Sequence, residues 1–367
     1  MVGESEFAAL EAAAENADFP AFQRAAADLW ARVGEAADVL ERIVPLFAKV
    51  PPAVSGQLAV GAVLRYRRGA PEHGLVAAVA DGLRRALEDA AAFADAWPKA
   101  AGRNAAFPAP GDGNDQEWFE YAAATLSRER RWPRRALPAD EAARYAGAWM
   151  MLDDWMTAAT GLLELREVRV AFPHREKVAR LARQLDPLRR DMFCLIGLLD
   201  MLDDEPLIVV DRAGKRAFRL RISGVGDNFQ LHTLIADVLS REGLVEGIRP
   251  EPEWVAAAAT GAPDGADRTR ALFQLTDGDG MAVPIDGRPA LIPLHRGRRV
   301  VVMDPCAYGR SWDLGRSFDV VPEVRLEEVL GPEVARSVAG PISEPGPARS
   351  HVHHERETGR VATFYQG

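Results

Sequence analysis

Cysteine is nearly absent from this chain of 367 residues, which carries two, Cys194 and Cys306. Two cysteines cannot build the disulfide framework of a small secreted domain, and they suit a reducing compartment. No apolar run reaches the roughly 20 residues needed to span a bilayer. The acidic start MVGESEF also lacks the basic beginning of a secretory signal. We therefore expect a cytoplasmic protein with no membrane partner.

Lysine is also scarce, and the only ones are Lys49, Lys99, Lys177 and Lys215. Asp and Glu number 54 against 45 Lys and Arg, which gives a formal net charge of −9. A chain this acidic has no general attraction to phosphate backbones or to anionic lipid. Nucleic acid is therefore not expected as a partner, and the bias toward arginine and alanine indicates a high-GC bacterial genome.

The glycine-rich motifs of nucleotide-binding proteins are missing as well. The segment GVGDNF, which begins at Gly224, has Phe229 where a dinucleotide fingerprint needs a third small residue. It does not end in the Gly-Lys-Ser/Thr of a phosphate loop, and Asp227 stands where a GxSxG elbow would have serine. We therefore expect no cofactor.

Helix-forming residues dominate the first part of the chain. Ala, Glu, Leu and Arg recur almost without interruption as far as about residue 166. We predict an all-α domain over residues 1–162. LELREVRVAF (163–172) alternates like a strand, and we place there the start of a smaller α/β domain with a mixed sheet, which extends to residue 340. Residues 341–367 are expected to be a flexible, histidine-containing tail, and the fold class is α+β.

Besides the strand at 163–172, the helix that follows Ala217–Val225 and a short helix at Glu253–Thr260, the sequence predicts two helical segments and five strands in the second domain. The helices are His174–Leu202, broken near Pro187, and Leu326–Ala339. The strands are Pro206–Asp211, Ala217–Val225, Ala271–Thr276, Ala290–Leu294 and Arg299–Met303, of which the last is expected to be central.

The stretch from Ala217 to Leu239 has the clearest local pattern in the chain. It reads as a half-buried strand, a glycine turn, an acidic cap at Asp227 or Asn228, and an amphipathic helix. The helix is expected to bury Leu231, Leu234, Ile235, Val238 and Leu239, and to leave Gln230, Thr233, Asp237 and Ser240 in solvent. His232 then lies at the rim of the buried face, near the mouth of a strand–helix turn, where open sheets bind ligands.

Two groups of residues could carry chemistry. In the first, Asp227 would be a nucleophile and His232 its base, or both would be structural residues of an ordinary helix start. The second is the loop after the strand at 299–303, where Cys306 could be a nucleophile with His295 or His232 as base. A binding loop is favoured there, since Arg310 suits a carboxylate and the loop is dense in polar and aromatic side chains, including Asp304, Tyr308 and Trp312.

Other motifs have simpler explanations that we prefer. Trp149, Trp155 and Met156 could line a ligand groove, but core packing explains them better. Arginines around Trp132, from Arg128 to Arg135, fit an exposed turn as well as an anion site.

Acidic and histidine clusters could hold a metal ion, but we expect none. The aspartate pairs 153–154 and 203–204, with Asp200, resemble the Mg²⁺ motifs of isoprenoid synthases only in part, because Thr157 stands where a further aspartate belongs. His351, His353 and His354 lie in the tail, outside any folded element that would hold structural or catalytic zinc.

The run GVGDNFQLHTLIADVL resembles the core of uncharacterised proteins from high-GC bacteria, and IPLHRGRRVVVMDPCAYGRSWDLG adds to that likeness. These segments are similar to the peptide-binding accessory proteins of ribosomal-peptide natural-product pathways of the crocagin type. The resemblance covers about the last half of the chain. It implies a repurposed enzyme fold that holds a precursor peptide.

The leading hypothesis is a non-catalytic cytoplasmic binding or scaffold protein whose partner is a peptide or another protein, with a homodimer as a further option. Its expected ligand-binding residues are Asn228, His232, His295, Asp304, Tyr308, Arg310 and Trp312. One alternative is a hydrolase-like enzyme that uses Asp227 and His232, with or without Cys306. Another is an interaction protein of a bacterial defence or signalling system.

Overall fold

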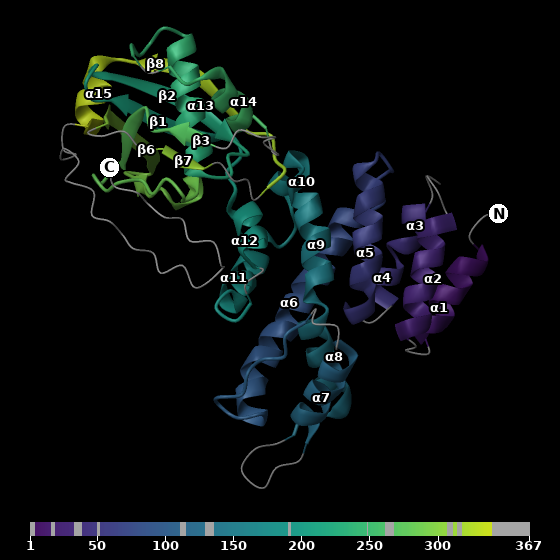
Figure 1. Cartoon of the computed structure of the whole chain (residues 1–367). Coiled ribbons are helices and arrows are strands. Elements are labelled where there is room, and N and C mark those ends of the chain that lie inside the picture. The colour runs from purple at the N-terminus through teal and green to yellow at the C-terminus, as the bar shows by residue number, and fades with distance from the viewer. Residues whose placement is uncertain are drawn as a thin grey trace.

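The computed structural model describes residues 4–15, 19–32, 39–49, 52–110, 115–128, 136–189, 192–247, 249–260, 268–306, 311–313 and 318–339. Helices fill its first half and a mixed sheet with covering helices follows, so the predicted α+β class is confirmed. Figure 1 shows the sheet at one end of the molecule and α1 to α3 at the other. No helix among these residues is long and apolar enough to cross a membrane.

The helical half pairs neighbouring helices around one hydrophobic core. Its elements are α1 (Glu4–Glu15), α2 (Phe19–Arg32), α3 (Val39–Ile43), α4 (Leu46–Lys49), α5 (Pro52–Arg67), α6 (Leu75–Ala100), α7 (Asp115–Ser127), α8 (Ala139–Met150), α9 (Leu152–Leu163), α10 (Arg166–Ala171), α11 (Arg175–Leu185) and α12 (Met192–Asp200). Trp149, Trp155 and Met156 are all buried in this core, so the simpler explanation of these residues is confirmed.

The predicted strand at 163–172 is wrong, because α9 ends at Leu163 and α10 begins at Arg166. Val168 and Phe172, four residues apart, are buried together in the helical core. Val170, which a strand would place on the same face as both, is 59% exposed. The period of burial is therefore helical. The domain boundary at 163 stays a prediction, and the first strand begins at Glu205.

The sheet has the order β4-β6-β1-β2-β8, with β5 also paired to β6. Its strands are β1 (Glu205–Asp211), β2 (Arg216–Ser223), β4 (Phe273–Asp277), β5 (Leu294–His295), β6 (Arg298–Pro305) and β8 (Glu323–Leu330), and a separate pair joins β3 (Arg268–Arg270) to β7 (Ser311–Asp313). β1 is parallel to β6 and antiparallel to β2, so the sheet is mixed. The strand predicted to be central, β6, is interior, but β1 occupies the centre.

Helices cover both faces of the sheet (Figure 1). One face packs on α13 (Asn228–Arg241), with α14 (Pro252–Ala258) beside it, and the other packs on α15 (Pro332–Ala339). Alternate residues of β1 divide between the two faces: Leu207 and Val209 join the α13 side, and Ile208 and Val210 the α15 side. β1 is therefore buried on both faces, which explains its unbroken apolar run.

Three predictions about the α/β half are corrected. The expected helix Leu326–Ala339 is in its first part strand β8, which pairs antiparallel with β2, and only Pro332–Ala339 is helical. The expected strand at 290–294 is a 3₁₀ turn, η1 (Pro289–Leu291), followed by β5. Gln230 and Thr233 are buried and not solvated. The reason is that α13 packs on α14 as well as on the sheet, including its edge strand β8.

A buried ion pair joins the helical half to the first strand. Arg169 of α10 donates from Nε and Nη2 to the two carboxylate oxygens of Asp203, at 2.8 and 2.7 Å. The two side chains are 1% and 4% exposed. Arg175 donates to the carbonyls of Leu199 and Met201 at 2.7 and 2.9 Å, and burial lowers its pKa. These contacts fix α12 and the start of β1 with respect to α10 and α11.

Candidate functional site

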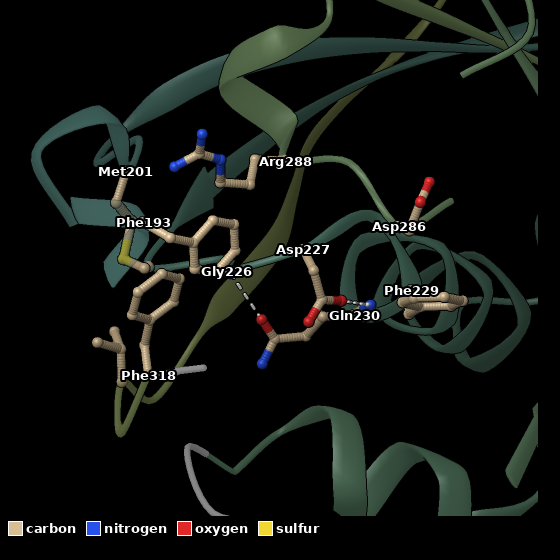
Figure 2. A pocket seen from close by; sticks show the side chains of 11 residues that line it. Phe193, Met201, Gly226, Asp227, Phe229, Gln230, Asp286, Arg288 and Phe318 are labelled. Atoms are coloured by element: carbon tan, nitrogen blue, oxygen red, sulfur yellow. Dashed lines mark hydrogen bonds between the residues drawn. The ribbon is translucent and has the colours of Figure 1, made fainter. Parts of the chain in front are cut away.

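A pocket of about 280 Å³ opens beside the turn between β2 and α13. Its walls come from α12, from the β2–α13 turn, from the segment before η1 and from the segment before β8 (Figure 2). The residues that line it are Phe193, Met201, Gly224, Gly226, Asp227, Phe229, Gln230, Asp286, Arg288, Phe318 and Val320. The predicted strand–helix turn therefore does lie at a pocket.

Two phenylalanines and an arginine form one end of this pocket. Phe193 and Phe318 stack with ring centroids 6.4 Å apart, and the guanidinium of Arg288 lies 5.4 Å from the Phe193 centroid. Figure 2 shows the three side chains together, with the Asp286 carboxylate directed away from them. Phe318 is buried, but Phe193 is 51% exposed. An aromatic side chain this exposed beside a cation is typical of a binding surface.

A second pocket, of about 370 Å³, adjoins the first at Phe193 and Arg288. It shares Phe193 and Arg288 with the first pocket and adds Leu291, which is 63% exposed, and residues of α11 and α12. We refer to the two pockets together as the α12 groove. Its lining residues come from both the helical half and the sheet half, and two of its apolar side chains, Phe193 and Leu291, are open to solvent.

The β2–α13 turn is built as the sequence predicts, with Asp227 as the helix cap. Asp227 Oδ1 accepts from the backbone N–H of Gln230 at 2.7 Å. Gly224 has φ +64°, a conformation that favours glycine. A Cβ at this position would lie 3.0 Å from Val320 and 3.1 Å from the Val321 carbonyl oxygen. Gln230 accepts from the Gly226 N–H at 2.8 Å and donates to the Ala258 carbonyl at 2.9 Å, which ties the turn to α14.

Asn228 holds the segment that carries Arg288. Its Nδ2 donates to the Pro284 carbonyl at 2.7 Å, and its backbone N–H donates to the Gly287 carbonyl at 2.8 Å. Arg299 holds the same segment from the far side, since its Nη1 donates to the carbonyls of Pro289 and Ile292. Asn228 was predicted to contact ligand, but it lies next to the groove and supports its wall.

His232 lies in the core and does not line either pocket of the α12 groove. Its side chain is 1% exposed, and its ring stacks on Phe273 with centroids 4.1 Å apart. Burial lowers its pKa to about 4, although the Phe273 carbonyl, 3.2 Å from Nε2, raises it in part. The imidazole is therefore neutral at pH 7 and away from solvent, so this geometry gives no support to a base acting on a ligand in the groove.

The stability of the protein should fall as acid protonates His232 in the unfolded chain. Histidine has a pKa of about 6.5 when unfolded and about 4 here. The unfolded state binds the proton first, so stability is full above pH 6.5 and declines toward pH 4. Between pH 7 and pH 5 we expect wild type to lose about 2 kcal/mol more than His232→Gln.

Urea unfolding of both proteins at the two pH values measures this difference. Glutamine keeps a polar side chain at the position and does not titrate there. Equal losses in the two proteins would contradict the buried, neutral state of His232.

The other predicted chemical residues are not gathered in the groove. Asp304 Oδ1 lies 2.8 Å from Nε of Arg212, which follows β1, and His295 Nδ1 lies 3.0 Å from Oδ1 of Asp279 in the loop after β4. Cys306 is partly exposed at the end of β6, and none of the three lines either pocket. Tyr308 and Arg310 lie outside the described residues, and of Trp312 only the backbone, in β7, is described.

Four of the five aspartates in the acidic clusters pair with arginines, and burial raises the pKa of the fifth, Asp154. Asp203 binds Arg169, and the remaining pairs are Asp204 with Arg166, Asp200 with Arg183, and Asp153 with Arg189. In the described part of the chain, no three His, Cys, Asp or Glu side chains are placed to hold a metal ion. Residues 129–135 of the arginine cluster and the tail histidines 351, 353 and 354 lie outside that part.

Sequence reasoning found Asp227 but missed Phe193, Arg288 and Phe318. These three residues come from three segments that are far apart in the sequence: α12, the segment before η1 and the segment before β8. No local sequence pattern links them. The one local sign of a site was Phe193 itself, a large aromatic side chain in the apolar helix α12. Comparison of the chain with protein-family models, with curated proteins and with solved structures found no match.

Proposed function

We propose that this chain is a non-catalytic binding protein that holds a peptide segment in the α12 groove. The observation that carries the proposal is the exposure of Phe193 and Leu291 beside Arg288, where two pockets adjoin. Adjoining pockets that combine apolar side chains with polar groups able to fix orientation are typical of ligand sites. A cytoplasmic role as accessory factor in a bacterial biosynthetic pathway remains part of the proposal, in line with the sequence resemblance.

The hydrolase alternative has weaker support. Asp227 lines the groove, but one of its oxygens already caps α13. Its expected base, His232, faces Phe273 in the core. A nucleophile and its base must lie within hydrogen-bond reach of each other and of substrate, and among the described residues the groove supplies no such pair.

Retention of peptides tests the proposal. Full-length protein is mixed with an equimolar library of acetylated hexapeptides and separated by gel filtration, and the retained peptides are counted by mass spectrometry. We expect wild type to retain a subset rich in apolar residues, and Phe193→Ala to retain that subset at least about tenfold less well, as for an aromatic hot spot.

Tyr121→Ala is the matched control, because Tyr121 of α7 is an aromatic of similar exposure and does not line the groove. It should retain peptides as wild type does. Peptide binding in the groove is refuted if wild type retains none, or if Phe193→Ala retains as much as wild type.

A further inference from the structure

Arg288 is half-buried and, unlike the buried arginines of the described chain, donates a hydrogen bond to no described residue. Arg169, Arg189 and Arg299 each donate to a carboxylate and to backbone carbonyls. Arg288 Nη1 is closed off from solvent without a hydrogen-bond partner, and its guanidinium makes no ion pair with any described carboxylate. A desolvated guanidinium N–H without an acceptor is unfavourable. A ligand could not reach the closed-off Nη1, but the side chain as a whole is half-buried and lines both pockets, so its other N–H groups are where an acceptor from a ligand would bind.

The guanidinium of Arg288 packs against α12. One face lies against Phe193, and Gly197 of α12 leaves the space that the group occupies. A Cβ at position 197 would meet Phe318 at 2.3 Å and Arg288 Nη1 at 3.1 Å. A planar guanidinium matches the two oxygens of a carboxylate.

The composition of the groove favours a carboxylate at the end of a peptide. Phe193, Phe318 and Met201 form an apolar wall next to Arg288, and in a terminal residue the α-carboxylate is separated from Cβ by only one carbon. A last side chain on the wall and its carboxylate at Arg288 can therefore be accommodated together. Asp227 and Asp286 also line the pocket, so a ligand with several acidic side chains would be repelled.

We propose that the α12 groove recognises the C-terminus of a peptide, with Arg288 binding the terminal carboxylate and the apolar last side chain lying against Phe193 and Phe318. This inference rests on the proposed peptide-binding function and names the part of the peptide that is bound. Arg288 is on this view the residue that determines specificity, and Asn228 and Arg299 position it through the 284–292 segment.

The proposal is tested with two acetylated hexapeptide libraries, one with a free and one with an amidated C-terminus. Each library is mixed with the full-length chain, and the retained peptides are measured after gel filtration. Wild type should retain free acids that end in an apolar residue about 10- to 100-fold better than the matching amides. Arg288→Met should lose this preference. Arg298→Met, which removes the same charge from an exposed residue outside the groove, should keep it.

Thermal melting shows whether Arg288→Met is folded, and its melting temperature should equal or exceed that of wild type, since no protein acceptor is lost. Equal retention of acids and amides by wild type would overturn carboxylate recognition. Peptide binding in the groove would still stand if Phe193→Ala lowered the retention of both libraries. Amides with an internal glutamate that bind as well as the free acids would also overturn it. No retention in either library would overturn both proposals.

Discussion

Replacement of Arg169 by alanine should lower the free energy of unfolding by about 3–5 kcal/mol, the range for breaking a buried ion pair. The change leaves the Asp203 carboxylate, 4% exposed, without its bidentate partner. It also removes the donor to the Leu163 and Glu164 carbonyls at the end of α9. The Asp203 carboxylate and the Leu163 carbonyl are closed off from water, so solvent cannot replace their lost hydrogen bonds.

Arg166→Ala on the same helix is the matched control. Arg166 pairs with Asp204, the neighbour of Asp203, but both of these side chains are half exposed. Exposed pairs contribute about 0–1 kcal/mol, so the control should remain near wild type. Urea denaturation measures both changes. Similar losses in the two variants would contradict the assignment of Arg169–Asp203 as the contact that fixes the helical half to the sheet.

Replacement of Trp155 by alanine should cost about 3–5 kcal/mol, as for other fully buried large aromatics. The indole of Trp155 meets Phe47 edge to face at 5.9 Å and fills the space next to Gly82 of α6. A Cβ at Gly82 would lie 2.1 Å from the ring, so α6 and α9 approach closely only because position 82 lacks a side chain. Rigid helices on both sides limit how far the cavity can collapse.

Trp118→Ala provides the comparison for this prediction. Trp118 of α7 is half-buried and touches Tyr121, with ring centroids 5.9 Å apart. Its truncation leaves a surface notch that water fills, so a loss of about 1 kcal/mol is expected. Calorimetric unfolding of the two variants would measure the difference. A Trp155→Ala protein as stable as Trp118→Ala would show that the α5–α6–α9 contact is looser than described.

Much of the helical half could be predicted because its signals are local. The stripe of apolar residues in α6, from Leu75 to Trp97, requires no knowledge of the partner helix. The β1–β2 hairpin and the Asp227 cap are likewise set by neighbouring residues. These elements lie where the sequence places them, within a few residues at their ends.

The elements that failed depend on distant partners. EVRLEEVL, the sequence of β8, is rich in helix-forming glutamate and leucine. It becomes a strand because it pairs along β2 and packs Val324 and Leu326 against the core on the α13 side. Ion pairs of Arg219 with Glu328 and of Arg221 with Glu327, at 2.6 and 2.5 Å, add to this pairing. Tertiary pairing therefore overrides local propensity here. The register that makes this pairing cannot be read from either segment alone.

The candidate site was predicted only at its edge for the same reason. Asp227 follows from a local turn, but the groove needs α12, the segment before η1 and the segment before β8 to meet. Each of these segments has ordinary composition, and Arg288 resembles many surface arginines until its lack of an acceptor is seen. His232 was misplaced because a polar residue at the rim of a helical stripe gives no sign that α13 is covered on several sides.

Peptide binding in the α12 groove is tested most directly by photo-cross-linking. Peptides that wild type retains are resynthesised with benzoylphenylalanine as the last residue, irradiated in the complex and mapped by mass spectrometry. The proposal predicts adducts on α12 and on the segments that hold Arg288 and Phe318, at or beside Phe193, Met201 and Phe318. Adducts confined to other parts of the chain, such as α1–α4 or α15, would contradict it.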